Sequence, residues 1–144
     1  DGRHHHCYIL MQLSKKTEDG MLNETVIANL QKAREIITPE DKWCVGVRWW
    51  AKDDQGGYAH CALGALEAVQ GRHRKNLAAS CDPEVIALVA TIPADEKAKS
   101  SDGWIDFPAN AHVAQYNNRS THKQVLEWFD HTIEHLKQHP MEAA

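Results

Sequence analysis

Cys61 is the side chain in this sequence whose surroundings best suit covalent chemistry. It begins the apolar segment CALGAL at residues 61–66, which is typical of a helix. A thiol in the first turn of a helix has a lowered pKa, because the helix dipole favours the thiolate. An adjacent imidazole, from His60 or His112, would supply the base of a cysteine hydrolase. The side chains that could orient this base are those of Asp106, Asn110 and Asn117.

The alternative for Cys61 is a structural role in the core. Cysteine is among the residue types most often buried, and here it stands among alanines and leucines. The flanking sequence matches none of the signatures around known cysteine nucleophiles. We therefore expect Cys61 to be buried and slow to react. The hydrolase, with catalytic residues Cys61, His60, His112 and Asn117, is kept as an alternative.

Three histidines near the carboxyl end recur at every fourth position: His131, His135 and His139. Two imidazoles one helical turn apart can chelate a divalent ion such as zinc or nickel. This row falls on a different side of the predicted helix from its apolar residues, so we expect it to be exposed and to bind metal adventitiously. No Cys-x-x-Cys pair marks a structural zinc site, and no cofactor is predicted. A histidine-based metal-binding protein is a second alternative.

Aromatic residues offer a third kind of site. Three of the five tryptophans lie within residues 43–50. We expect them to cover the core, because large aromatic side chains contribute most to buried area. The alternative is a ligand-binding groove formed by Trp49, Trp50 and Tyr116.

Four helices are predicted to position these residues, and they cover residues 23–37, 60–70, 82–92 and 121–136. Thr121 and Gln124 form the pattern of a capping box at the start of the last helix. The alternation of Val45, Val47 and Trp49 predicts a strand, and the glycines at 56–57 predict a turn. Residues 94–103 are expected to be turn-like, and 104–108 to be extended. The predicted fold class is mainly α: a compact four-helix domain with a short β-hairpin between the first two helices.

Length and composition limit the class of protein further. The 144 residues suit one domain, which we place at 21–144; residues 1–20, with a histidine run, are interpreted as a leader, tag or disordered extension. A net charge of −4 argues against nucleic-acid binding. The sequence contains no apolar run of membrane-spanning length and no signal peptide, so we predict a cytoplasmic protein without a disulfide framework.

Three motifs occur along the chain: WCxG at 43–46, CALGAL at 61–66 and YNNxxTxxxV at 116–125. Together they resemble a family of short bacterial and phage proteins described only as a domain of unknown function. The resemblance covers about residues 22–138. The family's third motif more often reads Tyr or Trp followed by Asn-Asp, so Asn118 stands in place of an acid, which weakens a catalytic role for a carboxylate there. The resemblance implies a compact helical fold and a bacterial or phage origin, and it assigns no activity.

These observations favour a non-enzymatic accessory or binding module of bacterial or phage origin. Its partner would be a protein or a small molecule rather than a membrane or a nucleic acid. The hydrolase centred on Cys61 is the alternative, and the metal-binding protein is the second alternative. The environment of the Cys61 thiol distinguishes the first two interpretations.

Overall fold

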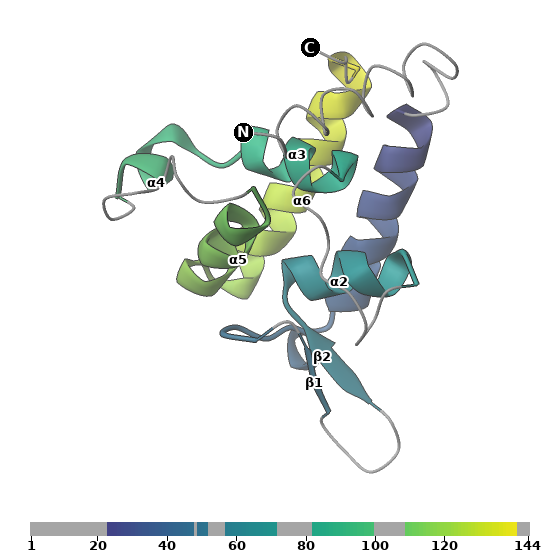
Figure 1. The fold of residues 1–144 in the computed structure, drawn as a ribbon, viewed down its shortest axis with the longest axis vertical. Coiled ribbons are helices and arrows are strands. Elements are labelled where there is room, and N and C mark those ends of the chain that lie inside the picture. Colours follow the sequence, from purple (N-terminus) through teal and green to yellow (C-terminus); the bar gives the residue numbers. More distant parts are fainter. Residues whose placement is uncertain (1–22, 48, 52–56, 72–81, 100–108, 141–144) are drawn as a thin grey trace, which may run out of the picture.

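The computed structural model describes residues 23–47, 49–51, 57–71, 82–99 and 109–140, and within them the chain is mainly helical, as predicted. Residues 1–20 lie outside the described part. A first helix covers residues 23–37. It is followed by the 3-10 turn η1 (Glu40–Lys42), the strands β1 (Trp49–Ala51) and β2 (Tyr58–His60), and the helices α2 (Ala62–Val69), α3 (Pro83–Ala90), α4 (Ala94–Lys99), α5 (Ala109–Arg119) and α6 (His122–Gln138). Figure 1 shows the strands at one end, with the longer helices α5 and α6 and the first helix above them.

Two of the predicted helices, α6 and α2, form as expected from local signals in the sequence. At the start of α6 the Gln124 N–H donates to the Thr121 hydroxyl at 3.1 Å, and the Thr121 N–H donates to Gln124 Oε1 at 2.8 Å. This reciprocal pair is the predicted capping box. Helix α2 is buried from Ala62 to Glu67 and ends before Gly71, whose φ of +74° suits glycine. The predicted helix over 60–70 is two residues too long at its start, because Cys61 is extended.

The expectation of four helices is wrong, because the described residues include two further helices, α4 and α5. Residues 94–99 were expected to be turn-like and are helical. Helix α5 has a polar sequence, ANAHVAQYNNR, and only Val113, Tyr116 and Asn117 of it are buried. A buried face this narrow gives little of the apolar periodicity on which sequence prediction relies. Residues 104–108, predicted to be extended, lie outside the described part of the chain.

A two-stranded sheet lies between the first helix and α2. Strands β1 and β2 pair antiparallel, with Trp49 opposite His60. The predicted strand begins four residues too early, since residues 45–47 bend and Gly46 has a φ of +84°. On the other side of β2, Trp43 forms a parallel bridge with His60. The predicted turn at 56–57 is described only at Gly57.

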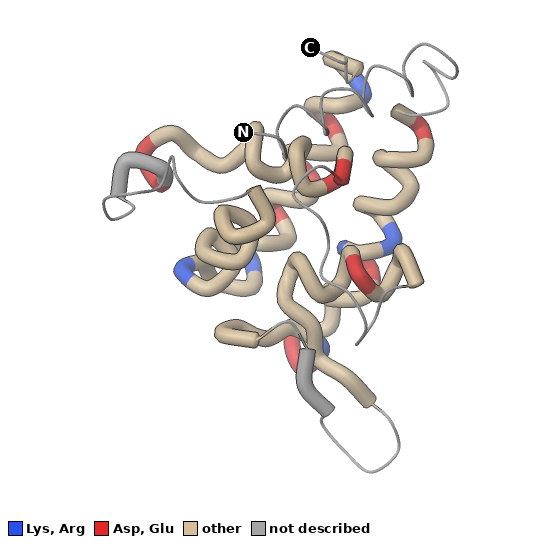
Figure 2. Tube along the Cα trace, viewed as in Figure 1, with Lys and Arg blue, Asp and Glu red and all other residues tan. Residues whose placement is uncertain are grey.

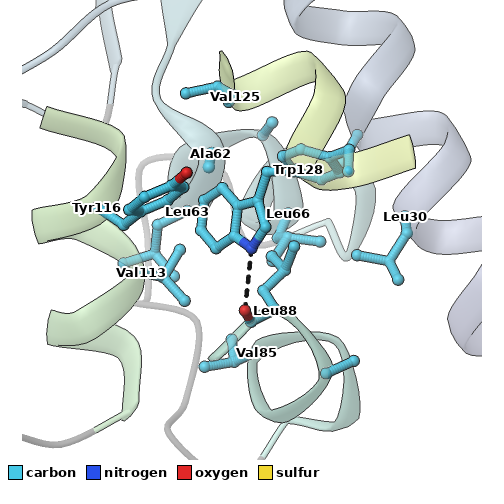
Figure 3. Packing of buried hydrophobic residues seen from close by; sticks show 14 of the residues in the cluster. Leu30, Ala62, Leu63, Leu66, Val85, Leu88, Val113, Tyr116, Val125 and Trp128 are labelled. Carbon is cyan, nitrogen blue, oxygen red and sulfur yellow. Dashed lines mark hydrogen bonds between the residues drawn. The ribbon is translucent and has the colours of Figure 1, made fainter. Parts of the chain in front are cut away.

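The core brings together all the long helices. Figure 3 shows Tyr116 of α5 beside Trp128 of α6, and the Trp128 indole N–H donating to the Leu88 carbonyl of α3 at 3.0 Å. The Tyr116 and Trp128 rings meet edge to face, with centroids 4.7 Å apart. One core cluster contains buried leucines from the first helix and α2 together with aromatic and aliphatic side chains of α6: Leu30, Leu63, Leu66, Phe129 and Ile133, with Val89 and Leu126 packed against them.

Polar contacts join the first helix to α6 at both ends. The Arg34 guanidinium bonds the Asp130 carboxylate at 2.6 and 2.9 Å. The Asn23 amide donates to the Leu136 carbonyl at 3.1 Å. The His122 ring lies 2.6 Å from the Ile37 carbonyl oxygen. These bonds hold the first helix along α6.

The charges of the described chain are dispersed. Figure 2 shows basic residues at separate places on the first helix, α5 and α6 rather than gathered on one element. Within the described residues, no helix combines the length and apolar character needed to cross a membrane.

Glu84 is a carboxyl group buried where α2 meets α3. It is 4% exposed, and the Gln70 side chain donates to its Oε1 at 2.9 Å. Burial raises the pKa of Glu84 above its ordinary value, and the bond from Gln70 offsets part of that rise. The pKa of this carboxyl is higher in the folded protein than in the unfolded chain, so the fold is more stable when the carboxyl is protonated. This stability is lost as pH rises from the unfolded-state pKa through the folded-state pKa.

We therefore expect the variant Glu84→Gln to gain stability relative to the parent protein as pH rises from about 4 to about 7. Urea denaturation at a series of pH values measures the difference in unfolding free energy. The variant Glu35→Gln, at an exposed position of the first helix, controls for the loss of one carboxylate. A difference between Glu84→Gln and the parent that does not change with pH would contradict the prediction.

Candidate functional site

The side chain of Asn117 joins three segments that are far apart in sequence. It comes from α5 and is fully buried. Its Oδ1 accepts two hydrogen bonds, from the Trp43 indole N–H at 2.8 Å and from the Ala62 backbone N–H at 3.0 Å. Its Nδ2 donates to the Cys44 carbonyl at 3.1 Å and to Asn118 Oδ1 at 3.3 Å. A carboxamide has two acceptor and two donor positions, so all four are occupied.

Asn118 continues this arrangement toward the surface. Its Oδ1 accepts the Gly46 N–H at 2.8 Å. Gly46 has a φ of +84°, a conformation that favours glycine over residues with a Cβ. An aspartate at position 118 would also present an oxygen to this N–H. We call the set Trp43, Cys44, Gly46, Cys61, Ala62, Asn117 and Asn118 the motif junction, because it unites the three motifs of the sequence.

The Cys61 thiol caps α2. Cys61 is the N-cap residue, and its Sγ accepts the Gly64 N–H at 3.4 Å. The residue is only 2% exposed. Sequence reasoning placed this thiol in the first turn, whereas it lies just before that turn, with its sulfur used as a hydrogen-bond acceptor.

The second thiol of the junction belongs to Cys44. Its Sγ donates to the Val47 carbonyl at 3.6 Å, and the residue is 8% exposed. Burial, with a smaller contribution from Cys61, raises the pKa of Cys44 to about 11. Cys44 is therefore a neutral thiol near neutral pH and a weak nucleophile. Neither cysteine is in a disulfide.

The predicted hydrolase residues are divided among β2, the N-cap position of α2 and helix α5. His60 is buried in β2, and because successive residues of an extended chain point to opposite faces, its ring and the Cys61 thiol diverge. His112 is half-buried on α5. The four hydrogen bonds of the Asn117 amide go to residues other than these histidines. The catalytic assignment stays a hypothesis.

The predicted aromatic and histidine sites lie elsewhere. Tyr116 is 8% exposed and packs in the core; Trp49 and Trp50 form β1, and their side chains lie outside the described part. On α6 the ring centroids of His131 and His135 are 6.4 Å apart, and those of His135 and His139 are 4.8 Å apart. All three histidines are exposed. Within the described residues no group of three or more potential ligands is placed to hold a metal.

A groove between α3 and α6, of about 520 Å³, is a feature that sequence reasoning missed. Its apolar lining includes Ile86 and Ala90 of α3 and Leu136 of α6, and its polar lining includes His135 and His139. We call it the α3–α6 groove. Ile86 and Ala90 are one helical turn apart, a spacing that marks a common face but does not reveal whether that face is covered.

The sequence was compared with models of known protein families. A family model matches residues 21–135, a span that contains the whole motif junction. The chain belongs to this family. It is described as a family of unknown function, DUF6197, so the expected resemblance to an uncharacterised family is confirmed. Comparisons with curated proteins and with solved structures give no match.

Replacing Asn117 with Ala is expected to lower the unfolding free energy by about 3 to 5 kcal/mol, because three buried groups of Trp43, Cys44 and Ala62 lose a partner at about 1 to 3 kcal/mol each. The control Asn118→Ala, at an exposed position, should cost about 1 kcal/mol. Urea denaturation measures both values.

A double-mutant cycle tests the contact itself. The variant Trp43→Phe removes the indole N–H, so Trp43→Phe combined with Asn117→Ala should cost about 1 to 2 kcal/mol less than the sum of the single changes. Additive costs would mean that the indole and the amide do not interact.

Proposed function

We propose that this protein is a non-enzymatic binding module of bacterial or phage origin, and that its ligand is a small amphipathic molecule held in the α3–α6 groove. The motif junction is the observation that supports a non-enzymatic function. Its amide is fully hydrogen-bonded, one of its sulfurs caps a helix and the other is a neutral thiol. Groups already engaged with one another are poorly suited to bind and turn over a substrate.

The groove between α3 and α6 offers an accessible concave surface. Its volume of about 520 Å³ lies within the range of small-molecule sites. Ala87 and Leu136 form buried parts of its lining, and exposed His135 and His139 form polar parts. An apolar body with one polar end matches this lining. A protein partner would need a larger contact area than such a groove supplies.

The electrostatics of the groove favour a polar end that carries positive charge or donates hydrogen bonds. Its lining comes from the later part of α3 and from the last turns of α6. The carboxyl-terminal end of a helix carries partial negative charge. We therefore assign the ligand to the class of alkyl or aryl amines rather than to fatty acids.

Binding of a fluorescent amphipathic amine tests this function. Dansylcadaverine should bind the full-length protein with increased emission, and decylamine should displace it at lower concentration than decanoate, which has the same chain and the opposite charge. In the variant Ala90→Trp the indole should fill the groove and weaken binding about tenfold or more, a loss of about 1.4 kcal/mol.

The variant Gln31→Trp is the matched control, because it adds the same side chain at an exposed position of the first helix. Equal binding by Ala90→Trp and Gln31→Trp would exclude the groove. Displacement by decanoate as readily as by decylamine would exclude the amine assignment.

A second candidate function is binding of a divalent transition metal by His135 and His139. The observation that favours it is the 4.8 Å separation of their ring centroids at the carboxyl end of α6, where His135 lies in the last turn and His139 is the C-cap residue. Histidines at i and i+4 can both direct a nitrogen at one ion. The site would leave coordination positions open for water or for a ligand in the groove.

Calorimetric titration with zinc chloride tests this candidate, in a background where the histidines at residues 4–6 are replaced by alanine. We expect His135→Ala and His139→Ala each to weaken zinc binding by about tenfold or more. His131→Ala should have a smaller effect, since its ring is farther from His135. Equal effects of all three changes, or none, would contradict a site formed by His135 and His139.

A further inference from the structure

The backbone places Cys44 and Cys61 side by side. Trp43 and His60 form a parallel bridge, and the Cys44 N–H donates to the His60 carbonyl at 3.0 Å. Cys44 and Cys61 are therefore the next pair along two parallel segments. Neighbouring strands lie about 4.7 to 4.9 Å apart, which falls within the range of about 4.4 to 6.8 Å between the Cα atoms of a disulfide.

The two thiols leave the same face of this pair of segments. Trp43 and Cys61 both have extended dihedral angles. Side chains alternate between faces along extended backbone, so the side chains that follow Trp43 and His60 point to the common opposite face. Both cysteines are buried there, at 8% and 2% exposure.

The Asn117 amide fixes the separation of the two segments. It donates to the carbonyl of Cys44 and accepts the N–H of Ala62, the residue after Cys61. One side chain thus holds both cysteine-bearing segments in register. The electrostatic effect of Cys61 on the Cys44 thiol is a further sign of their proximity.

We propose that Cys44 and Cys61 are a modification site at which a peroxide converts two neighbouring thiols into a disulfide. Cys44, the more exposed of the two, reacts first, through the small fraction of its thiol that is ionised. Because its pKa is about 11, the reaction is slow near neutral pH and accelerates as pH rises. The thiolate attacks a peroxide oxygen, the O–O bond breaks, and the departing hydroxide takes up a proton, which leaves a sulfenic acid on Cys44. The Cys61 sulfur then attacks the Cys44 sulfur, the S–O bond breaks, and the second hydroxide leaves as water with the Cys61 proton.

Both thiols are oxidised and the peroxide is reduced to two molecules of water. The bond joins the residues after η1 to the start of α2 and closes the loop that contains β1 and β2. It also removes the Cys44 contact with the Val47 carbonyl and the Cys61 cap of Gly64. Oxidation would therefore alter the loop on which Val45 and Val47 are exposed, at 48% and 51%.

Non-reducing peptide mapping after treatment with hydrogen peroxide tests the site. The protein is the full-length variant Cys7→Ser with Cys81→Ser, which leaves only the proposed pair. We expect a peptide linked through Cys44 and Cys61, its loss on reduction, and a higher melting temperature of the oxidised form, since closing a loop restricts the unfolded chain. In the same background, Cys44→Ser and Cys61→Ser should each abolish the link.

Sulfinic or sulfonic acid on Cys44 without the linked peptide would overturn the proposal. Two intact thiols after peroxide treatment at alkaline pH, where the Cys44 thiolate is more abundant, would also overturn it. Circular dichroism checks that the double serine variant is folded. If the double serine variant is unfolded, peptide mapping of the chain with all four cysteines replaces it as the test. A link between Cys44 and Cys61 that exceeds every other pairing supports the site, and a predominance of links to Cys7 or Cys81 refutes it.

Discussion

The amide of Asn117 is the interaction on which the arrangement of this fold depends. Its partners lie 55 to 74 residues earlier in the chain, on the segment before the strands and at the start of α2. Each partner is a backbone or indole group that is costly to bury unpaired. One buried side chain therefore satisfies three groups on two other segments, and α5 must present it at one height and rotation. The capping of α2 and the bend at Gly46 follow from that placement.

The residues that suggest catalysis and the proposed ligand site lie in different parts of the molecule. The residue types that indicate catalysis in the sequence, cysteine and asparagine, meet in the motif junction. There the Asn117 amide donates to the Cys44 backbone carbonyl, and the Cys61 thiol accepts the Gly64 N–H. The reaction that we propose for the junction joins its two neighbouring thiols to each other. The ligand site that we propose lies on a different surface, the α3–α6 groove, which shares no residue with the junction.

The sequence predicted those parts of the fold that are determined locally. The capping box of Thr121 and the apolar stripe that includes Phe129 specify α6 without tertiary information. Helix α5 was missed because its buried face is narrow and contains Asn117, a residue with low helix propensity. The individual members of the site were singled out by type, as with Cys61 and Asn117. The hydrogen-bond partners of these residues were not predicted. Those bonds join segments that are far apart in the sequence, and a local sequence pattern does not indicate that such segments are close in space.

Asn117 was predicted to orient a catalytic base, but its amide bonds other groups. The physical reason applies to buried carboxamides in general. A buried carboxamide is stable only when its oxygen and its nitrogen are both satisfied. Backbone groups at the start of a helix and in a bent loop have the same need, since regular structure does not supply their partners. The two requirements are met together where a helix such as α5 passes between such segments. In this chain the Trp-Cys-x-Gly motif, the small-residue helix and the distant Asn pair meet at one such junction.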